Sequence, residues 1–231
     1  MSSGEVVRFS LRQRLEHVAV MTLFVALALT GFPQKFPDTA WARWLVDAMG
    51  GLGVARWLHR AAGLGFGALA ALHLGSAVAG LITRRQALSL VPSRQDFRDV
   101  VQNLRYYVGL TEKKARFDRF DYREKFEYWG MVLGAVVMTF TGLVLYFPLL
   151  VTRVLPGELI PVAKVAHSNE GLLAFLVVIT WHIYNAHLAP EVFPFDRSVF
   201  TGRISRERME HEHPLELERS PQGTPERPEP P

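Results

Sequence analysis

The sequence predicts an all-α membrane protein, a four-transmembrane-helix bundle with both termini in the cytoplasm. Nearly half of its 231 residues are hydrophobic, and four windows contain no Asp, Glu, Lys or Arg. Each window has the roughly 18–20 residues that a helix needs to cross about 30 Å of hydrocarbon. Positive residues crowd the connection between the second and third windows, which places that connection inside. The windows are residues 17–34, 61–83, 128–152 and 171–190.

Prolines and aromatic residues mark the ends of the expected helices. The first helix should end at Pro33 and the third at Pro148, because proline removes a backbone donor and clashes with the preceding turn. Trp41, Trp44 and Trp57 lie in or beside the loop after the first helix, where they suit the membrane interface. The helices are expected at about residues 14–32, 55–83, 122–147 and 162–188.

The remaining segments are polar. The cytoplasmic loop 84–125 is rich in Arg and Lys, and its stretch 95–107 has the periodicity of a helix lying on the membrane surface. We expect residues 1–189 to form one transmembrane domain and residues 190–231 to form a polar cytoplasmic tail. Its end, 221–231, is rich in Pro and Glu and is expected to be disordered. His211 and His213 in the tail are expected to be solvated.

Composition excludes several classes of function. The chain has no cysteine, which excludes iron–sulfur clusters, thiolate metal sites and covalent haem attachment through cysteines. The formal net charge is +4, but the arginines cluster beside the membrane spans, as the positive-inside rule requires. We therefore expect membrane lipid around the chain and no nucleic-acid partner.

The histidines of the hydrophobic stretches lie at two expected depths. His59 and His167 lie near the outer surface, whereas His17, His73 and His182 lie near the cytoplasm. A histidine in lipid is costly unless it has a partner. Imidazoles that face each other across helices at two heights are what a protein needs to hold haem irons without covalent attachment. The pattern predicts a cytochrome with two b haems.

Helix geometry reduces the number of possible histidine pairs. The 14 or 15 residues between histidines on one helix span about 21–23 Å and return to within about 40–60° of the same face. The upper pair is His59 with His167. In the lower pair, His182 is matched with His17 as the preferred partner and with His73 as the alternative. Because His73 is an additional histidine at this depth, a third haem also stays open. His187 points about 140° away from His182.

Several motifs around these histidines have a familiar order and spacing. They are Arg14-Leu15-Glu16-His17 leading to Leu29-Thr30-Gly31-Phe32, Leu58-His59-Arg60, Glu124 to Gly130 with Thr141-Gly142-Leu143, and His167-Ser168 through Trp181-His182-Ile183-Tyr184. They resemble the dihaem cytochrome b membrane subunit family, which is cytochrome b561-like and includes the formate dehydrogenase gamma-subunit and the cytochromes b of hydrogenases and thiosulfate reductases. The resemblance covers residues 8–216. The ending Phe193 to Asp196, Thr201-Gly202-Arg203 and Glu212-His213-Pro214 is similar to a branch found with multihaem cytochromes.

The resemblance implies a haem shared by His59 and His167 and a second shared by His17 and His182. It also implies a quinone pocket near the start of the third helix. The matching segment here is 119–125, in which Asp121 and Arg123 replace smaller neutral residues.

The expected function is therefore electron relay by a dihaem b-type cytochrome of the bacterial inner membrane, as a subunit of a respiratory oxidoreductase. Its partner would be a periplasmic catalytic subunit, a multihaem cytochrome or an iron–sulfur subunit. Quinone is the expected substrate, and whether the chain has its own quinone site stays open. Two alternatives stay open. One is a stand-alone cytochrome b561-like quinone oxidoreductase, and the other is a haem-free membrane scaffold or transporter, although no convincing internal repeat of the transporter kind is recognised.

Overall fold

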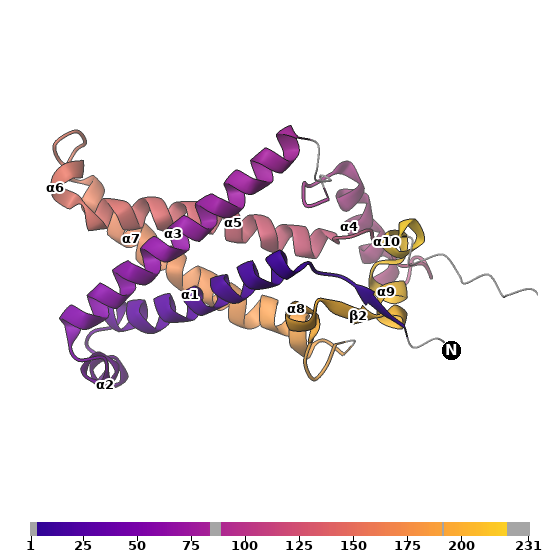
Figure 1. Ribbon diagram of the computed structural model, residues 1–231, viewed down its shortest axis with the longest axis horizontal. Coiled ribbons are helices and arrows are strands. Elements are labelled where there is room, and N and C mark those ends of the chain that lie inside the picture. The colour runs from indigo at the N-terminus through magenta and orange to yellow at the C-terminus, as the bar shows by residue number, and fades with distance from the viewer. Residues whose placement is uncertain (1–3, 84–88, 191, 221–231) are drawn as a thin grey trace, which may run out of the picture.

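Four long helices dominate the computed structural model, which describes residues 4–83, 89–190 and 192–220. All four are long and apolar enough to cross a membrane, which confirms the predicted spans (Figure 1). The fourth span changes character midway, because its second half is π-helical. The spans are α1 (Leu11–Lys35), α3 (Leu52–Ile82), α5 (Tyr122–Tyr146) and α7 (Leu159–Val177) continued by η1 (Val178–His182) and η2 (Tyr184–Leu188).

The apolar side chains of these helices point outward rather than into a core. Leu72 is 72% exposed and Phe140 is 64% exposed, and both lie in the middle of a span. In water such a surface would be strongly unfavourable, but lipid tails solvate it. The exposed apolar surface therefore supports membrane insertion of the bundle.

Side-chain caps begin α1 and α5, and one predicted helix end is wrong. Ser10 and Asp121 cap α1 and α5, each with a reciprocal capping box, which satisfies the free amides of a first turn. Pro33 does not end α1, which continues to Lys35. Pro33 removes one backbone donor, the one that would reach the carbonyl oxygen of residue 29. The helical bonds resume after it, because the backbone N–H of Phe36 donates to the carbonyl oxygen of Phe32 at 2.9 Å.

The order of the helices around the bundle is α1, α3, α5, α7. Helix α1 packs along α3 and α5 packs along α7, whereas α3 joins the two pairs through α5. Of the neighbouring pairs, α1 and α7 contact each other least. The bundle is thus two helix pairs with one close seam and one open seam.

Each of the three connections between the spans contains a helix. The first connection was predicted only as a loop, but it contains α2 (Ala40–Ala48), whose Trp44 is 70% exposed. The surface helix expected at 95–107 is confirmed as α4 (Arg94–Tyr107). A short turn of helix, α6 (Pro148–Val151), follows α5. Residues 84–88 of the long connection lie outside the described residues.

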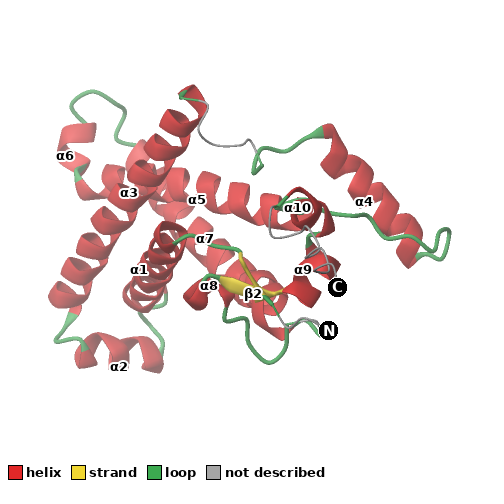
Figure 2. Cartoon of the chain, turned by 45° about the vertical axis from the view of Figure 1, so that its right-hand side comes forward, coloured by secondary structure: helices red, strands yellow, loops and turns green. Residues whose placement is uncertain are grey.

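The tail is folded rather than a plain polar extension. Strand β1 (Glu5–Val7) pairs antiparallel with β2 (Arg203–Ser205), with Val6 opposite Ile204. Around them lie α8 (Ser198–Thr201), α9 (Arg206–Glu212) and α10 (Pro214–Arg219) (Figure 2). We call β1, Arg8 and residues 198–219 the terminal module; its small core is Val6, Ile204, Met209 and Leu217. The expected disorder of 221–231 concerns residues outside the described ones.

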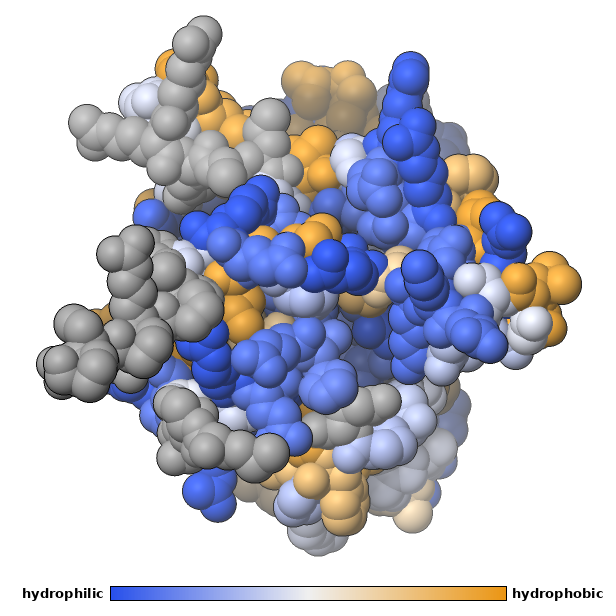
Figure 3. Space-filling view, turned by 90° about the vertical axis from the view of Figure 1, so that its right-hand side faces the viewer, coloured by the Kyte–Doolittle hydropathy of each residue, from blue (hydrophilic) through white to orange (hydrophobic). Residues whose placement is uncertain are grey.

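The terminal module sits at one end of the bundle and joins residues 5–8 to residues 198–219 there. Hydrophilic residues dominate this face, as Figure 3 shows from that side. Gly202 ends α8 in the left-handed region, with φ of 79°, and a Cβ there would lie 2.7 Å from the carbonyl oxygen of Phe9. Only glycine fits both the conformation and the close approach.

Arg8 and His213 lie buried at the contact between the terminal module and α5. Arg8 pairs with Glu216 at 2.5 Å and with Glu124 at 3.3 Å. Its guanidinium donates to Nε2 of His213 at 3.1 Å, and Nδ1–H of that ring donates to the carbonyl oxygen of Asp118 at 2.7 Å. His213 is only 5% exposed, so the expectation that it is solvated is wrong. Polar composition did not reveal the buried arginine partner.

Acid is expected to weaken the contribution of His213 to the stability of the terminal module. Burial and the charge of Arg8 lower the pKa of His213 to about 4, below its ordinary value of about 6.5. Because the unfolded ring binds the proton more readily, the contribution of His213 is complete above pH 6.5 and is lost as pH falls toward 4. We expect this single contribution to fall by about 2 kcal/mol between pH 7.5 and 5.

Amide hydrogen exchange in residues 203–219 at the two pH values measures this loss. Asp196, whose pKa is lowered chiefly through its bond with Arg208 against the effect of burial, loses its contribution only below its ordinary range of about 4. The stability advantage of the natural chain over a His213→Gln variant, which keeps an acceptor toward Arg8, should shrink between pH 7.5 and 5. An advantage that is the same at both pH values would contradict the role of His213.

Candidate functional site

Two pairs of imidazoles face each other across the bundle. His59 on α3 and His167 on α7 have ring centroids 6.2 Å apart. His17 on α1 and His182 on η1 have centroids that are also 6.2 Å apart. The first pair lies near the start of α3 and α7, and the second lies near the start of α1 and the end of η2. The structure thus brings together the two pairs favoured from the sequence, at two heights.

The first pair is held by two matching Thr-Gly dipeptides. Nδ1 of His59 lies 2.9 Å from Oγ1 of Thr30, and Nδ1 of His167 lies 2.9 Å from Oγ1 of Thr141. Each hydroxyl also donates to the carbonyl oxygen four residues earlier in its own helix. The threonine oxygens are therefore placed to accept from the ring Nδ1–H, which leaves Nε2 of each ring with a free lone pair.

The glycine after each threonine gives the ring its space. A Cβ on Gly31 would lie 2.9 Å from Cε1 of His59, and one on Gly142 would lie 3.2 Å from Cε1 of His167. Both distances are shorter than a normal van der Waals contact between carbon atoms. Glycine at these two positions is what allows the imidazoles to lie flat against α1 and α5.

The second pair has a carboxylate partner and an unsatisfied nitrogen. Nδ1 of His182 lies 2.9 Å from Oε2 of Glu127. Nδ1 of His17 and Nε of Arg14 are buried, and neither has a hydrogen-bond partner in the described part of the chain. Orphaned buried polar atoms are rare in native proteins. Two of them one turn apart indicate that a further group belongs beside His17.

The spacing of both pairs fits one iron between two imidazoles. Histidine nitrogens bind first-row metal ions at about 2 Å, and the ring centre lies about 1 Å behind the nitrogen. Two imidazoles on opposite sides of one iron therefore have centroids roughly 6 Å apart. Among the described residues no group of three or more His, Cys, Asp or Glu forms a metal site, so pairing, rather than clustering, is the arrangement present.

His73 and His187 take no part in either pair. Nδ1 of His73 lies 2.9 Å from Oε2 of Glu16, and its Nε2 lies 3.0 Å from the hydroxyl of Tyr128. The ring of His187 stacks on Phe195 with centroids 4.5 Å apart. Both nitrogens of His73 are thus occupied by the protein itself.

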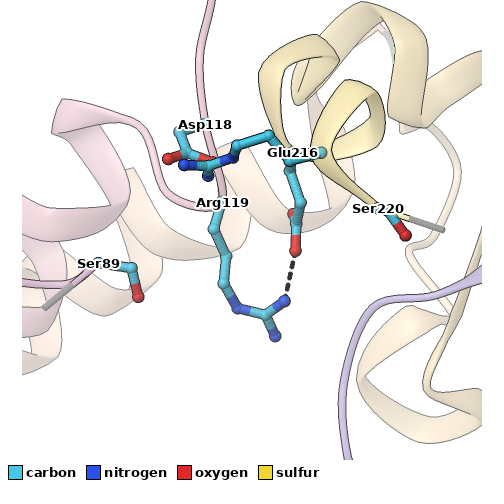
Figure 4. A pocket seen from close by; sticks show the side chains of 6 residues that line it. Ser89, Asp118, Arg119, Glu216 and Ser220 are labelled. Atoms are coloured by element: carbon cyan, nitrogen blue, oxygen red, sulfur yellow. Dashed lines mark hydrogen bonds and ion pairs between the residues drawn. The ribbon is translucent and has the colours of Figure 1, made fainter. Parts of the chain in front are cut away.

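The segment that resembles a quinone pocket is engaged in contacts of its own. Asp121 caps α5 and accepts from Arg123, and Arg119 pairs with Glu216 of the terminal module. A pocket opens beside Arg119, as Figure 4 shows. It is lined by Ser89, Asp118, Arg119, Glu216, Arg219 and Ser220.

Sequence reasoning missed three of the groups that hold the rings. Thr30, Thr141 and Glu127 appeared only as parts of motifs and had no role. The signal was present in the spacing, because Thr30-Gly31 and Thr141-Gly142 both lie one turn before the end of a span. Their function becomes visible only when α1 is laid against α3 and α5 against α7.

The four apolar helices and the family match that follows support a multi-pass bacterial membrane protein of the b-type cytochrome class, which serves electron transfer. The chain belongs to the family of prokaryotic cytochrome b561, whose model matches residues 8–193. It is 25% identical over 185 residues, 78% of both chains, to the formate dehydrogenase cytochrome b556(fdo) subunit of Escherichia coli (strain K12). The same subunit of Escherichia coli O157:H7 matches equally. Haem b is the cofactor that this family implies, which leaves the haem-free scaffold or transporter without support.

Proposed function

We propose that the chain is a dihaem b-type cytochrome of the inner membrane that relays electrons between a periplasmic redox partner and the quinone pool of a respiratory chain. The observation that carries the proposal is the pair of equal 6.2 Å separations between facing imidazoles at two heights. His59 with His167 and His17 with His182 would be the axial ligands. His73 is left out because both of its nitrogens have protein partners.

When bound, haem supplies one-electron chemistry. The chain's own residues hold the ligands in place. Thr30 and Thr141 fix the tautomer of the first pair, and the Glu127 carboxylate makes the ring of His182 more basic. The two sites therefore differ in the charge behind their ligands, which is a means of setting two different reduction potentials.

Charge supports a cytoplasmic location for the terminal module. The arginine-rich connection and both chain ends lie at that end of the bundle, and positive residues concentrate on the cytoplasmic side of membrane proteins. The pair of His17 and His182 would then lie toward the cytoplasm. The pair of His59 and His167 would lie toward the periplasm, within reach of a partner there.

A partner is needed because the chain has no cysteine for an iron–sulfur cluster. The Escherichia coli relative is by name a subunit of formate dehydrogenase, which supports a similar role here as the membrane subunit of a larger oxidoreductase. The catalytic or electron-carrying partner would dock at the outer end of the bundle.

Reduction by a quinol tests this function. The purified chain in lipid nanodiscs should develop a b-type α band when a soluble quinol analogue is added. The absorbance of that band should not exceed the absorbance of the dithionite-reduced protein. Reduction by dithionite but not by any quinol analogue would remove the quinone pool from the proposal. Lack of a b-type band even with dithionite would remove the cytochrome itself.

Thr30→Val tests the support of the upper ligand. Valine keeps the shape of the side chain but removes the oxygen that accepts from His59. Loss of such a partner commonly costs 10–100-fold in metal affinity, so we expect the upper haem to be lost roughly that much more readily to apomyoglobin, a haem acceptor. Thr22→Val, whose hydroxyl bonds only its own helix backbone, is the matched control. Equal transfer rates in both variants would contradict the supporting role.

A further inference from the structure

The two halves of the bundle repeat each other along the chain. Helices α1 and α5 each have 25 residues, and their features match at a constant separation of 111 positions. Their N-caps are Ser10 and Asp121, both with capping boxes, and their C-caps are Phe36 and Phe147, with nearly identical φ and ψ. Proline follows each C-cap, and the dipeptides Thr30-Gly31 and Thr141-Gly142 match at the same separation.

The contacts repeat as well. Thr30 on α1 meets His59 on α3 as Thr141 on α5 meets His167 on α7, both at 2.9 Å. Near the terminal module, Glu16 meets His73 as Glu127 meets His182, again both at 2.9 Å. Each unit is therefore one helix that carries glutamate, threonine and glycine, followed by one helix that carries two histidines. Because both units cross the membrane in the same direction, they form a repeat of the parallel kind known in membrane proteins.

A π-helical turn reconciles the different spacing of the two histidines within each unit. His59 and His73 are 14 positions apart, whereas His167 and His182 are 15 apart. The extra residue falls where η1 (Val178–His182) replaces the α-helix. Single π turns are the usual way for a helix to take in one extra residue without changing what lies beyond it. His182 consequently meets Glu127 just as His73 meets Glu16.

One pair of equivalent positions breaks the repeat. His17, next to Glu16, corresponds to Tyr128, next to Glu127. His17 faces His182 across the open seam between α1 and α7. Tyr128 instead reaches across the closer seam between α3 and α5, and its hydroxyl lies 3.0 Å from Nε2 of His73. That contact occupies the nitrogen with which His73 would bind iron.

The backbone of the closer seam also differs. Gly67 of α3 lies so near α5 that a Cβ on it would be 3.0 Å from Cγ2 of Thr139. The seam between α3 and α5 is thus drawn together, while the equivalent seam between α1 and α7 is left open.

We propose that the bundle is a tandem repeat of one two-helix, histidine-bearing unit, in which Tyr128 closes a second lower haem position and His73 is its retained histidine. The proposal rests on the proposed function, because it assigns haem to the equivalent position. Tyr128 is then the residue that limits the chain to two haems and places the lower one on the α1–α7 side alone.

An exchange of the two non-equivalent residues tests the repeat. In a His17→Tyr, Tyr128→His double variant, the lower haem should move to the α3–α5 side, so that the chain still binds two haems. In that background His73→Gln should remove one haem, whereas His182→Gln should leave both. The upper haem, whose ligands are unchanged, reports that the variant is folded.

Single changes in the natural chain give a second test that needs no rebuilt seam. His73→Gln and Tyr128→Phe should each keep two haems with unchanged spectra, whereas the equivalent His182→Gln should keep one. Loss of a haem in His73→Gln would overturn the proposal, and so would a folded exchange variant that binds only the upper haem. A natural chain without haem would instead overturn the proposed function, so the two failures are distinguishable.

Discussion

A His59→Ala variant is expected to bind one haem per chain instead of two. The ring of His59 faces His167 at a centroid distance of 6.2 Å, and no other described histidine lies at that end of the bundle. With one imidazole removed, the upper iron would keep a single protein ligand. Pyridine haemochrome absorbance, divided by protein concentration from amino-acid analysis, measures the change.

The lower haem should be untouched by this substitution, because its ligands lie about 20 Å away along the helices. His187→Ala serves as the control, since that ring stacks on Phe195 outside both pairs. Two haems in His59→Ala, or one haem in His187→Ala, would contradict the ligand assignment.

Gly31→Val is expected to remove the same haem while leaving every histidine in place. The first carbon of the valine side chain would lie 2.9 Å from Cε1 of His59, a distance at which the ring must move. A displacement of about 1 Å is enough to spoil a preorganised site. We therefore expect a haem content near one per chain, measured in the same way as above.

Gly75→Val on α3 is the matched control. It makes the same change in a helix, but a Cβ on Gly75 meets no other described atom within 4 Å. Any general effect of valine on helix stability is therefore shared by both variants. Equal haem contents in the two would show that the space beside His59 is not required.

The spans could be predicted from the sequence because charge-free length is nearly sufficient for a helix in lipid. Their ends were harder. Pro33 has the usual signature of a helix end, but α1 continues past it to Lys35. Helix α2 was missed because Trp41 and Trp44 suggested interfacial anchors, which need no particular backbone conformation.

Depth alone could pair His59 with His167 but could not choose between His17 and His73. Both lie at the same height, and residue counting does not show which neighbours each ring meets. The structure places Glu16 and Tyr128 on the two nitrogens of His73. Those partners come from α1 and α5, so only the packing of three helices separates the candidates.

The terminal module and the repeat escaped prediction for a related reason. Val6 and Ile204 form one strand pair although nearly the whole chain separates them, and a three-residue strand has no recognisable period. The two halves share few identical residues, among them Glu16 and Glu127 or Thr30 and Thr141. Their equivalence is evident from repeated contacts rather than from repeated letters.

The haem content of the unmodified chain tests the central claim most directly. Protein purified in detergent, reduced with dithionite and assayed as the pyridine haemochrome, should contain two b haems per chain. That number follows from two facing imidazole pairs and from a third position closed by Tyr128. A chain that binds no haem b, or one that binds three, would contradict the account.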